Sequence, residues 1–465
     1  MATQLHLLTL QSAQTGVLTS PEPDRYSLAP QTLAPCPIAT NYFKLAMRYS
    51  TTYNRMMYLA KKKFSTWLAP HLKLTSTSDP EFTGKLLSLA EFILTNSPSS
   101  YKTPVLCIMR SDYMLDTSQS NPGPKLVEYN TIASSFGCLS TKLAKVHETV
   151  NETFALNQNI ASNDATSLLV GGLSACCSQK GVIVMVVQPG ERNLFDQGVI
   201  ELEVMKRGRK IVRMSLDQIS THSTLDPASN VLTIRLDGSN VPVECVYFRA
   251  GYDPSDYKSE IDWEGRKKLE LSTAIKCPDV FGQLFGAKKI QQILTIKEER
   301  DRLYEGEEES YKAQQNDIEK TWVKMWDLKE FDTIVQMVES ASSSNTSFVL
   351  KPQREGGGNN VYGPDVLPHL KTLKPEERDG WVLMETIVAE KFDNTLVKEG
   401  KAAYDGVCSA EIGIFGVTCF DDEGNDRIQA TEKNTQGYIC RCKQEGVDEG
   451  GVAAGFAFLS SIRLV

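Results

Sequence analysis

Residues 348–363 read FVLKPQREGGGNNVYG, and no other segment of the chain says as much about its architecture. A short apolar run ends at Lys351 and is followed by Glu355, three glycines and two asparagines. Consecutive glycines let a backbone approach a ligand closely, and their N–H groups suit an anion such as a phosphate chain. Lys351 supplies a mobile positive charge for phosphate, and Glu355 supplies the hard oxygen that Mg²⁺ prefers. The segment therefore favours a nucleotide-binding loop.

A flexible hairpin tip is the alternative interpretation, because Gly and Asn also favour tight turns between strands. The lysine before the glycines and the carboxylate beside them favour the nucleotide interpretation. The spacing of the glycines matches neither a Walker A loop nor a dinucleotide-binding fingerprint.

The composition limits the partners of the protein. The 465 residues carry a net charge of −8, which argues against a nucleic-acid partner. No apolar run reaches the length of a membrane span. The start, MATQLHLLTLQSAQ, lacks the basic and apolar regions of a signal peptide. The eleven cysteines have no zinc-binding spacing and indicate reduced thiols. We expect a cytoplasmic protein without a membrane partner, or a secreted one if a leader has been removed from this chain.

Polar side chains follow or interrupt several apolar runs. The run Val105–Met109 predicts a buried strand, and Arg110 follows it directly. Glu128 and Asn130 lie two apart in a second predicted strand, so both point to one face. A carboxylate and an amide oxygen on one face form a reasonable half-site for Mg²⁺, although a solvated strand face shows the same alternation.

The middle of the chain predicts an α/β unit. Strand and helix patterns alternate from residue 182, and the runs 231–236 and 241–248 predict a hairpin turning at Asp237-Gly238. Arg249 follows the second run and could clamp a carboxylate with two hydrogen bonds; an ordinary surface arginine is the alternative. Residues 1–40 predict an irregular lead-in, residues 281–294 a helix, and residues 297–345 a charged helical segment.

Ten short motifs occur together in one order. They are RSDYM at 110–114, EYNTI at 128–132, ERNLFDQ at 191–197, YFRAGY at 247–252, KCPD at 276–279, GAKKIQQ at 286–292, KPQREGGGNNVYG at 351–363, LME at 383–385, SAEIGIFG at 409–416 and GGVAAG at 450–455. In order and spacing they resemble the eukaryotic glutathione synthetases, a family with the ATP-grasp fold. The resemblance runs from about residue 100 to residue 460, and the start of the chain looks shortened.

The resemblance implies an α/β ATP-grasp fold with a separate α/β substrate-binding domain and glycine-rich lid loops. Residues 1–181 would form the N-terminal part of the ATP-grasp body, 182–288 the substrate-binding domain, and 289–465 the C-terminal part. The lid would span about 344–412, with an antiparallel sheet around 348–415, and a Gly/Ala-rich loop would close near the C-terminus.

The resemblance also implies a reaction. The protein would ligate γ-glutamylcysteine to glycine at the expense of ATP, through an acyl phosphate, giving glutathione, ADP and phosphate. It would need Mg²⁺ and form a homodimer. The alternative is a glutathione synthetase-like paralogue with an altered acceptor or weak activity, such as a secreted effector.

The resemblance assigns roles to individual residues. The expected Mg²⁺ ligands are Glu128, Asn130 and Glu355. The expected ATP-binding residues are Glu128, Lys288, Lys351, Glu355, Gly356, Gly357, Gly358, Asn359, Asn360, Tyr362, Met384, Glu385, Ile387, Glu411, Lys443 and Glu449. The expected substrate-binding residues are Arg110, Ile132, Ala133, Ser134, Ser135, Glu191, Arg192, Asn193, Gln197, Arg249, Tyr252, Arg441, Val452 and Ala453. Arg110, Lys351 and Arg441 would be catalytic.

Two positions bear on specificity. Ala133 stands where the family usually has serine, which removes one hydroxyl near the donor substrate; a hydrogen bond to a charged partner contributes about 1.5–3 kcal/mol. The pair Ala453-Ala454 is small, which in this family accompanies glycine as the acceptor. We expect glycine to be preferred over β-alanine by roughly 10- to 200-fold in kcat/KM.

Overall fold

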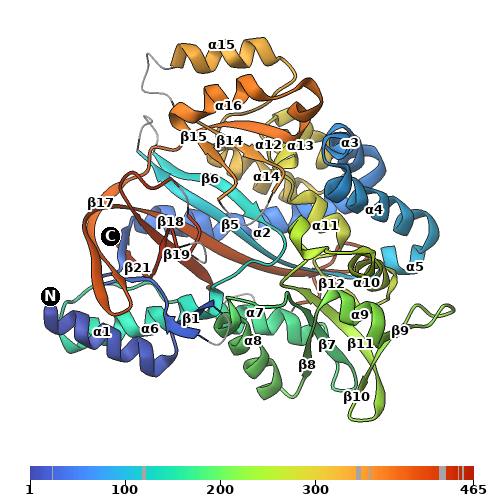
Figure 1. Ribbon diagram of the computed structural model, residues 1–465, viewed down its shortest axis with the longest axis horizontal. Helices are drawn as coiled ribbons and strands as arrows, with labels where there is room; N and C mark the ends of the chain where they lie inside the picture. The colour runs from blue at the N-terminus through green and yellow to red at the C-terminus, as the bar shows by residue number, and fades with distance from the viewer. Residues whose placement is uncertain are drawn as a thin grey trace.

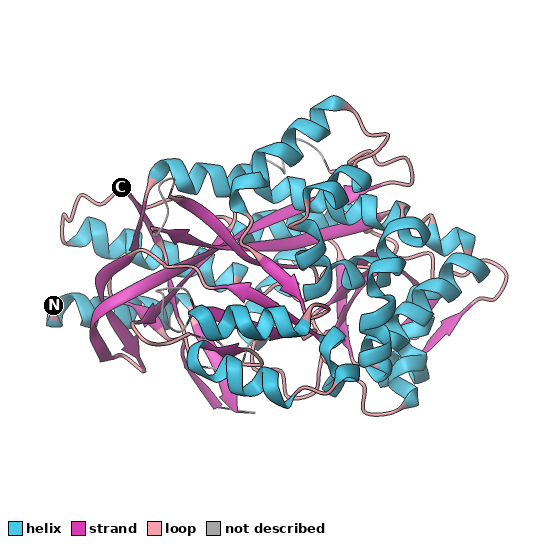
Figure 2. Ribbon diagram, turned by 90° about the horizontal axis from the view of Figure 1, so that it is seen from above, coloured by secondary structure: helices cyan, strands magenta, loops and turns pink. Residues whose placement is uncertain are grey.

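Figure 1 shows the computed structural model of the chain. The structure describes residues 1–22, 25–117, 122–341, 347–354, 358–428, 436–448, 450–452 and 455–465. Within them, thirteen strands form one large sheet and four strands form a second, smaller one. Helices lie on both sides of the long strands (Figure 2). The predicted α/β class is confirmed.

The long antiparallel pair β5 and β18 forms the centre of the large sheet. β5 (Val105–Asp116) pairs with β18 (Lys401–Phe420) from Val105 opposite Phe420 to Met114 opposite Glu411. β6 (Gly123–Asn130) lies on β5, and β19 (Tyr438–Gln444) lies on β18. The remaining strands on that side are β17 (Lys391–Lys398), β3 (Gln31–Thr32) and β20 (Phe458–Ser460).

The segment from residue 182 continues this sheet with mostly parallel strands. β7 (Val182–Val186), β8 (Lys210–Met214), β11 (Ser239–Phe248) and β12 (Ile275–Cys277) are parallel, and β12 joins β5. Their continuous apolar runs are buried between α8 (Leu194–Lys206) on one side and α9 (Leu216–His222) and α10 (Glu260–Leu271) on the other. β9 (Ser223–Leu225) and β10 (Leu232–Leu236) complete the edge.

The predicted hairpin at Asp237-Gly238 is confirmed. β10 and β11 are antiparallel, and both turn residues have positive φ, 49° for Asp237 and 81° for Gly238. Two such residues match the right-handed twist of the flanking strands, which is why a two-residue Asp-Gly loop suffices.

The smaller sheet is antiparallel, as the resemblance predicts. Its order is β13 (Met325–Asp327), β16 (Trp381–Glu385), β14 (Phe348–Pro352) and β15 (Val361–Tyr362). α15 (Phe331–Ala341) and α16 (Val366–Thr372) cover it at the top of Figure 1 and bury Leu350 and Leu383 with it. The sheet ends at Glu385; residues 391–415, also expected in it, pair in the large sheet because β17 folds back on β18.

Two sequence-based expectations about local structure were wrong. The lead-in contains α1 (Ala2–Thr15), which packs on α6 (Gly137–Thr153) and buries Leu8 and Ser12. Packing on a distant helix stabilises this element more than its own weak periodicity predicts. The segment 297–345 also includes a strand, β13, which carries Trp326 next to Leu383 of β16.

Short elements fill the remaining chain. They are β1 (Leu18–Glu22), β2 (Arg25–Leu28), β4 (Cys36–Ile38), α3 (Ala69–Ser78), α4 (Lys85–Asn96), α5 (Pro98–Tyr101), α7 (Ala165–Ala175), α11 (Val280–Phe285), α12 (Lys288–Leu294), α13 (Lys297–Leu303), α14 (Glu309–Asp317) and β21 (Ile462–Leu464). None of the helices in these described ranges is long and apolar enough to cross a membrane.

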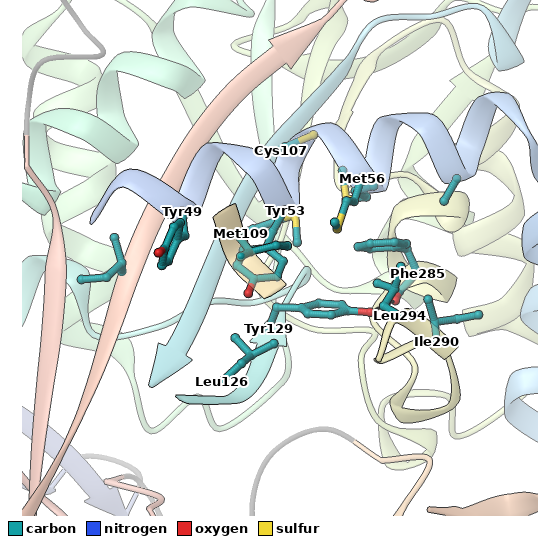
Figure 3. Close-up of a cluster of buried hydrophobic side chains, with 14 of the residues drawn as sticks. Tyr49, Tyr53, Met56, Cys107, Met109, Leu126, Tyr129, Phe285, Ile290 and Leu294 are labelled. Carbon is teal, nitrogen blue, oxygen red and sulfur yellow. Dashed lines mark hydrogen bonds between the residues drawn. The ribbon is translucent and has the colours of Figure 1, made fainter. Parts of the chain in front are cut away.

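An aromatic core supports the strand that carries Glu128 and Asn130. Tyr53 of α2 (Thr40–Lys62) stacks on Tyr129 with ring centroids 5.8 Å apart, and Tyr129 stacks on Phe285 of α11 at 5.1 Å (Figure 3). The Tyr129 hydroxyl donates to the Phe285 carbonyl at 3.1 Å. Since side chains alternate along a strand, burying Tyr129 turns Glu128 and Asn130 to the opposite face.

Candidate active site

A cavity of about 470 Å³ lies between the large sheet and the small sheet. Strands β5, β6, β14, β16, β18 and β19, the turn after β6 and the start of α12 all contribute to its wall. The sequence-predicted residues that line it are Arg110, Glu128, Asn130, Ile132, Ala133, Ser134, Ser135, Tyr252, Lys288, Lys351, Asn359, Asn360, Tyr362, Met384, Glu385, Ile387, Glu411, Arg441, Lys443 and Val452.

Six predicted residues are not part of this wall: Glu191, Arg192, Asn193, Gln197, Arg249 and Gly358. Gln197 donates to the Glu191 carboxylate at 2.8 Å, so these two residues hold each other at the start of α8. Glu355, Gly356, Gly357, Glu449 and Ala453 lie outside the residues that the structure describes.

Glu128 lies beside two ammonium groups. Its Oε2 is 3.0 Å from Nζ of Lys288, and Lys351 donates to the carbonyl of Val127 at 2.9 Å. Burial alone would raise the pKa of Glu128, but Lys288 and Lys351 outweigh it and hold that pKa well below its usual range. The group is therefore a carboxylate at neutral pH, with the charge that a cation site requires.

A second cluster combines two arginines with two carboxylates. Nε and Nη2 of Arg110 donate to the two oxygens of Asp112 at 2.7 and 2.8 Å. Nη2 of Arg441 donates to Asp112 at 2.7 Å and also to Glu411. Burial would lower the pKa of Arg441, but the Glu411 and Asp112 carboxylates outweigh it and raise that pKa. Burial raises the pKa of Glu411, and Arg441 opposes the shift.

The alternation of three neighbouring strands explains this cluster. Arg110 and Asp112 are two apart on β5, and Arg441 and Lys443 are two apart on β19. Glu411 of β18 lies between these strands, opposite Arg441 in register. Because side chains two apart share a face, the strands present one charged face to the cavity.

The turn after β6 has a constrained backbone. Ala133 and Phe136 have φ values of 53° and 68°, in the left-handed region that non-glycine residues rarely adopt. Arg249 donates to the carbonyl of Ser134 at 2.8 Å and to the hydroxyl of Ser135 at 2.6 Å. In this structure Arg249 thus holds the turn, whereas the sequence suggested that it clamps a ligand carboxylate.

A close backbone approach next to this turn breaks a predicted helix. The segment 281–294, expected as one helix, is divided into α11 and α12 at Gly286. A Cβ atom at Gly286 would lie 2.5 Å from the hydroxyl of Thr131. Only glycine lets the backbone pass the turn this closely, and the break starts α12 at Lys288.

Sequence reasoning missed two residues, Asp112 and Asp196. Asp112 could have been found, because it lies two residues after Arg110 and therefore on the same strand face. Asp196 accepts hydrogen bonds from the backbone N–H groups of Phe136, Cys138 and Leu139 at 2.9, 2.9 and 3.1 Å. No local pattern reveals it, because its partners lie 57 to 60 residues away.

The donor set of the cavity suits a cation bound together with anions. Glu128 supplies a carboxylate, and Asn130 supplies an amide oxygen, because its Nδ2 donates to Asp112 at 2.9 Å and to the Arg110 carbonyl at 3.3 Å. Hard oxygens of this kind fit Mg²⁺. The cations that line the cavity are Arg110, Lys288, Lys351, Arg354, Lys391, Arg441 and Lys443. They suit phosphate and carboxylate groups.

Comparison with known proteins gives one consistent result. The model of the family "Eukaryotic glutathione synthase, ATP binding domain" matches residues 3–464. Human glutathione synthetase is 34% identical over 460 residues, covering 96% of this chain and 93% of its own. The glutathione synthetase large chain of Schizosaccharomyces pombe is 32% identical over 465 residues, covering 94% of this chain and 91% of its own. Among solved structures, a glutathione synthetase-like effector from Globodera pallida in apo form has a TM-score of 0.73 at 17% identity. The match covers 100% of this chain and 96% of that one.

Proposed function

The chain belongs to the eukaryotic glutathione synthase family, and from this premise we propose that its charged cavity ligates γ-glutamylcysteine to glycine. It is an ATP-dependent ligase of glutathione biosynthesis. The observation that carries the proposal is the convergence of Arg110, Arg441, Lys288 and Lys351 around Glu128 and Asn130. Four cations beside a hard-oxygen pair suit a triphosphate and a substrate carboxylate in one space.

The reaction requires an activated carboxylate. The carboxylate of γ-glutamylcysteine attacks the γ-phosphorus of ATP, which breaks the bond to ADP and forms an acyl phosphate. The amine of glycine then attacks the acyl carbon, an amide bond forms and phosphate leaves. Lys288 and Lys351 would neutralise charge on the phosphates during transfer. Arg110 and Arg441 keep N–H groups for a carboxylate or the departing phosphate.

Mg²⁺ belongs to the proposal as well. Glu128 and Asn130 would hold it, and Glu355, outside the described residues, is the further ligand that the sequence predicts. When bound, Mg²⁺ supplies neutralising charge for phosphate oxygens. Two observations support this choice of ligands: Glu128 is a carboxylate held ionised by its neighbouring cations, and Asn130 has both amide hydrogens committed to β5.

Glycine is the acceptor that we propose. The last glycine-rich segment supplies Gly450, Gly451 and Val452 to the cavity wall. Ala453 is outside the described residues, so its part in acceptor choice remains a prediction. Competition between glycine and β-alanine tests it, with an expected preference for glycine of roughly 10- to 200-fold in kcat/KM. Equal use of the two amino acids would contradict the glycine assignment.

Phosphate release from ATP tests the proposed ligation directly. We expect release that depends on γ-glutamylcysteine and glycine together, with glutathione formed in equal amount. Arg110→Met should abolish it, and Arg48→Met, a change of an exposed arginine paired with Asp317, should not. ATP binding without substrate-dependent release would favour a binding protein, and release with another amino acid only would favour a paralogue with a changed acceptor.

We also propose a homodimer. Leu202 and Met205 of α8 are 58% and 50% exposed, and Tyr26 of the β1–β2 hairpin is 56% exposed. Tyr26 packs edge-to-face on Phe195 of α8 at 5.1 Å. Leu202 follows Phe195 by seven residues, two helical turns, and so lies on the same side of α8. Large apolar patches mark association surfaces. Leu202→Glu should convert the dimer to a monomer in sedimentation analysis, and a monomeric wild-type protein would contradict the proposal.

We propose, last, a cytoplasmic location and a division of the chain into three domains. All eleven cysteines are free and buried, which suits the cytoplasm. The parts 1–181, 182–288 and 289–465 remain our proposed domains, and limited proteolysis at their boundaries tests them.

A further inference from the structure

The Asp112 side chain is completely buried and is not part of the cavity wall. Its two oxygens accept four hydrogen bonds, two from Arg110, one from Arg441 and one from Asn130. Oδ2 accepts three of these bonds and Oδ1 accepts one. Because the side chain is completely buried and lies outside the cavity wall, Asp112 acts through its three partners and not by binding a metal or substrate itself.

These bonds determine which N–H groups remain for ligands. A guanidinium has five N–H groups. Arg110 uses two on Asp112 and one, on Nη1, on the Ser135 carbonyl at 3.2 Å. Two of its hydrogens remain, one on each terminal nitrogen. Arg441 lines the cavity and commits Nη2 to Asp112 and Glu411. Its Nε is buried without an acceptor among the described residues, which leaves Nη1 for a ligand.

Asp112 also decides the orientation of the Asn130 amide. Both groups that Asn130 faces, the Asp112 carboxylate and the Arg110 carbonyl, are acceptors only. The NH₂ group must face them, and the amide oxygen must point away, on the face shared with Glu128. Without the Asp112 charge, the Asn130 amide could flip and turn its NH₂ group toward the metal site. An NH₂ group has no lone pair to offer a cation, so the metal would lose this ligand.

The neighbouring strand leaves space for this arrangement. Gly413 of β18 lies opposite Asp112 in register. A Cβ atom there would lie 2.4 Å from Oδ1 of Asp112 and 2.8 Å from Cδ of Arg110. Gly413, the first glycine of the SAEIGIFG motif, is thus required by the packing of the Asp112–Arg110 pair and of Ile439, whose Cγ2 would lie 2.6 Å away.

We propose that Asp112 is a positioning residue that simultaneously orients two arginines for the donor carboxylate and an asparagine oxygen for Mg²⁺. The inference rests on the proposed ligase function and deepens it: one buried charge couples the donor subsite to the metal subsite. In this proposal none of the three partners of Asp112 binds the acceptor glycine. Loss of Asp112 should therefore affect the donor and the metal and leave the acceptor unaffected.

Asp112→Asn tests the proposal with steady-state kinetics. We expect the KM for γ-glutamylcysteine and the Mg²⁺ concentration for half-maximal rate each to rise about 10- to 100-fold, as for changes of residues that hold metal ligands. The KM for glycine should stay within twofold. The matched control is Asp279→Asn, another buried aspartate, which pairs with Lys61 at 2.8 Å and accepts from the N–H of Gly282 in α11. This variant should be less stable but should keep the wild-type KM for γ-glutamylcysteine, KM for glycine and Mg²⁺ concentration for half-maximal rate.

Gly413→Ala provides a second variant that removes no charge. Its added methyl group should displace Asp112 and Arg110 and reproduce the same selective rise. Its control is Gly416→Ala on the same strand, where the methyl group meets the Ser50 carbonyl at 3.0 Å on the α2 side. If Asp112→Asn fails to fold, the comparison of these two alanine variants decides the question.

Calorimetric binding of γ-glutamylcysteine separates this inference from the proposed function, because it needs no turnover. Binding by the wild type that weakens about 10- to 100-fold in Asp112→Asn supports the inference even without ligase activity. Binding and Mg²⁺ dependence within twofold of wild type would overturn it while leaving an active ligase established. An equal loss for donor, metal and glycine would show a purely structural role, and a wild type that does not bind γ-glutamylcysteine would overturn both.

Discussion

Replacing Asp196 with asparagine should destabilise the protein strongly. Asp196 is completely buried on α8, and its oxygens accept the N–H groups of Phe136, Cys138 and Leu139 at the start of α6. No side chain of α6 itself caps this end. Nη2 of Arg249 lies 3.6 Å from Oδ2. One carboxylate therefore caps a helix, orders the turn 131–136 and neutralises a buried arginine.

The magnitude follows from the donors that asparagine cannot satisfy. Its oxygen can replace Oδ1, which accepts from Cys138 and Leu139, but its NH₂ group then faces the N–H of Phe136 and Arg249. A buried donor without an acceptor costs about 1–3 kcal/mol, and a broken buried ion pair costs about 3–5 kcal/mol. The two effects share atoms and do not add, so we expect a loss of about 3–5 kcal/mol.

Equilibrium urea unfolding measures this loss. The matched control is Asp164→Asn, at the N-cap of α7, where Asp164 accepts from Ser167 at 3.1 Å in an exposed position. Asparagine caps as well as aspartate there, so the control should change stability by less than about 0.5 kcal/mol. If Asp196→Asn unfolds within about 1 kcal/mol of wild type, the assignment of Asp196 as a remote cap and counter-charge is wrong.

Burial lowers the pKa of His147 to about 4, below the usual 6.5. Between pH 6.5 and pH 4 the unfolded chain therefore binds a proton at this residue that the folded chain does not. The free energy of unfolding should fall by about 3 kcal/mol as the pH drops through this window. His147→Gln should flatten the acid side of a stability–pH curve, and an unchanged curve would contradict this origin. Ala133→Ser should lower the KM for γ-glutamylcysteine about tenfold by adding a hydroxyl to the cavity wall, with acceptor preference unchanged. Glu128→Gln should raise the Mg²⁺ concentration for half-maximal rate about tenfold or more, because a charged ligand becomes neutral; a normal Mg²⁺ titration would rule out Glu128 as a ligand.

Local patterns in the sequence predicted several of the elements, whereas most of the cavity residues followed from the family resemblance. Period-two alternation places Glu128 and Asn130 on one face of β6, and burial of Tyr129 on the other face agrees with it. Asp237-Gly238 predicts its turn because few dipeptides tolerate two positive φ values. These features depend on neighbours within a few residues, so one sequence suffices to predict them.

Tertiary structure alone decided how these elements hold one another. Asp112 meets Arg441 across 329 residues, and Asp196 caps a helix that begins almost 60 residues earlier. Gly286 breaks a helix because Thr131 lies against its backbone. α1 exists because α6 covers it. In each case the energy comes from burying or pairing groups distant in the chain, which no local periodicity records.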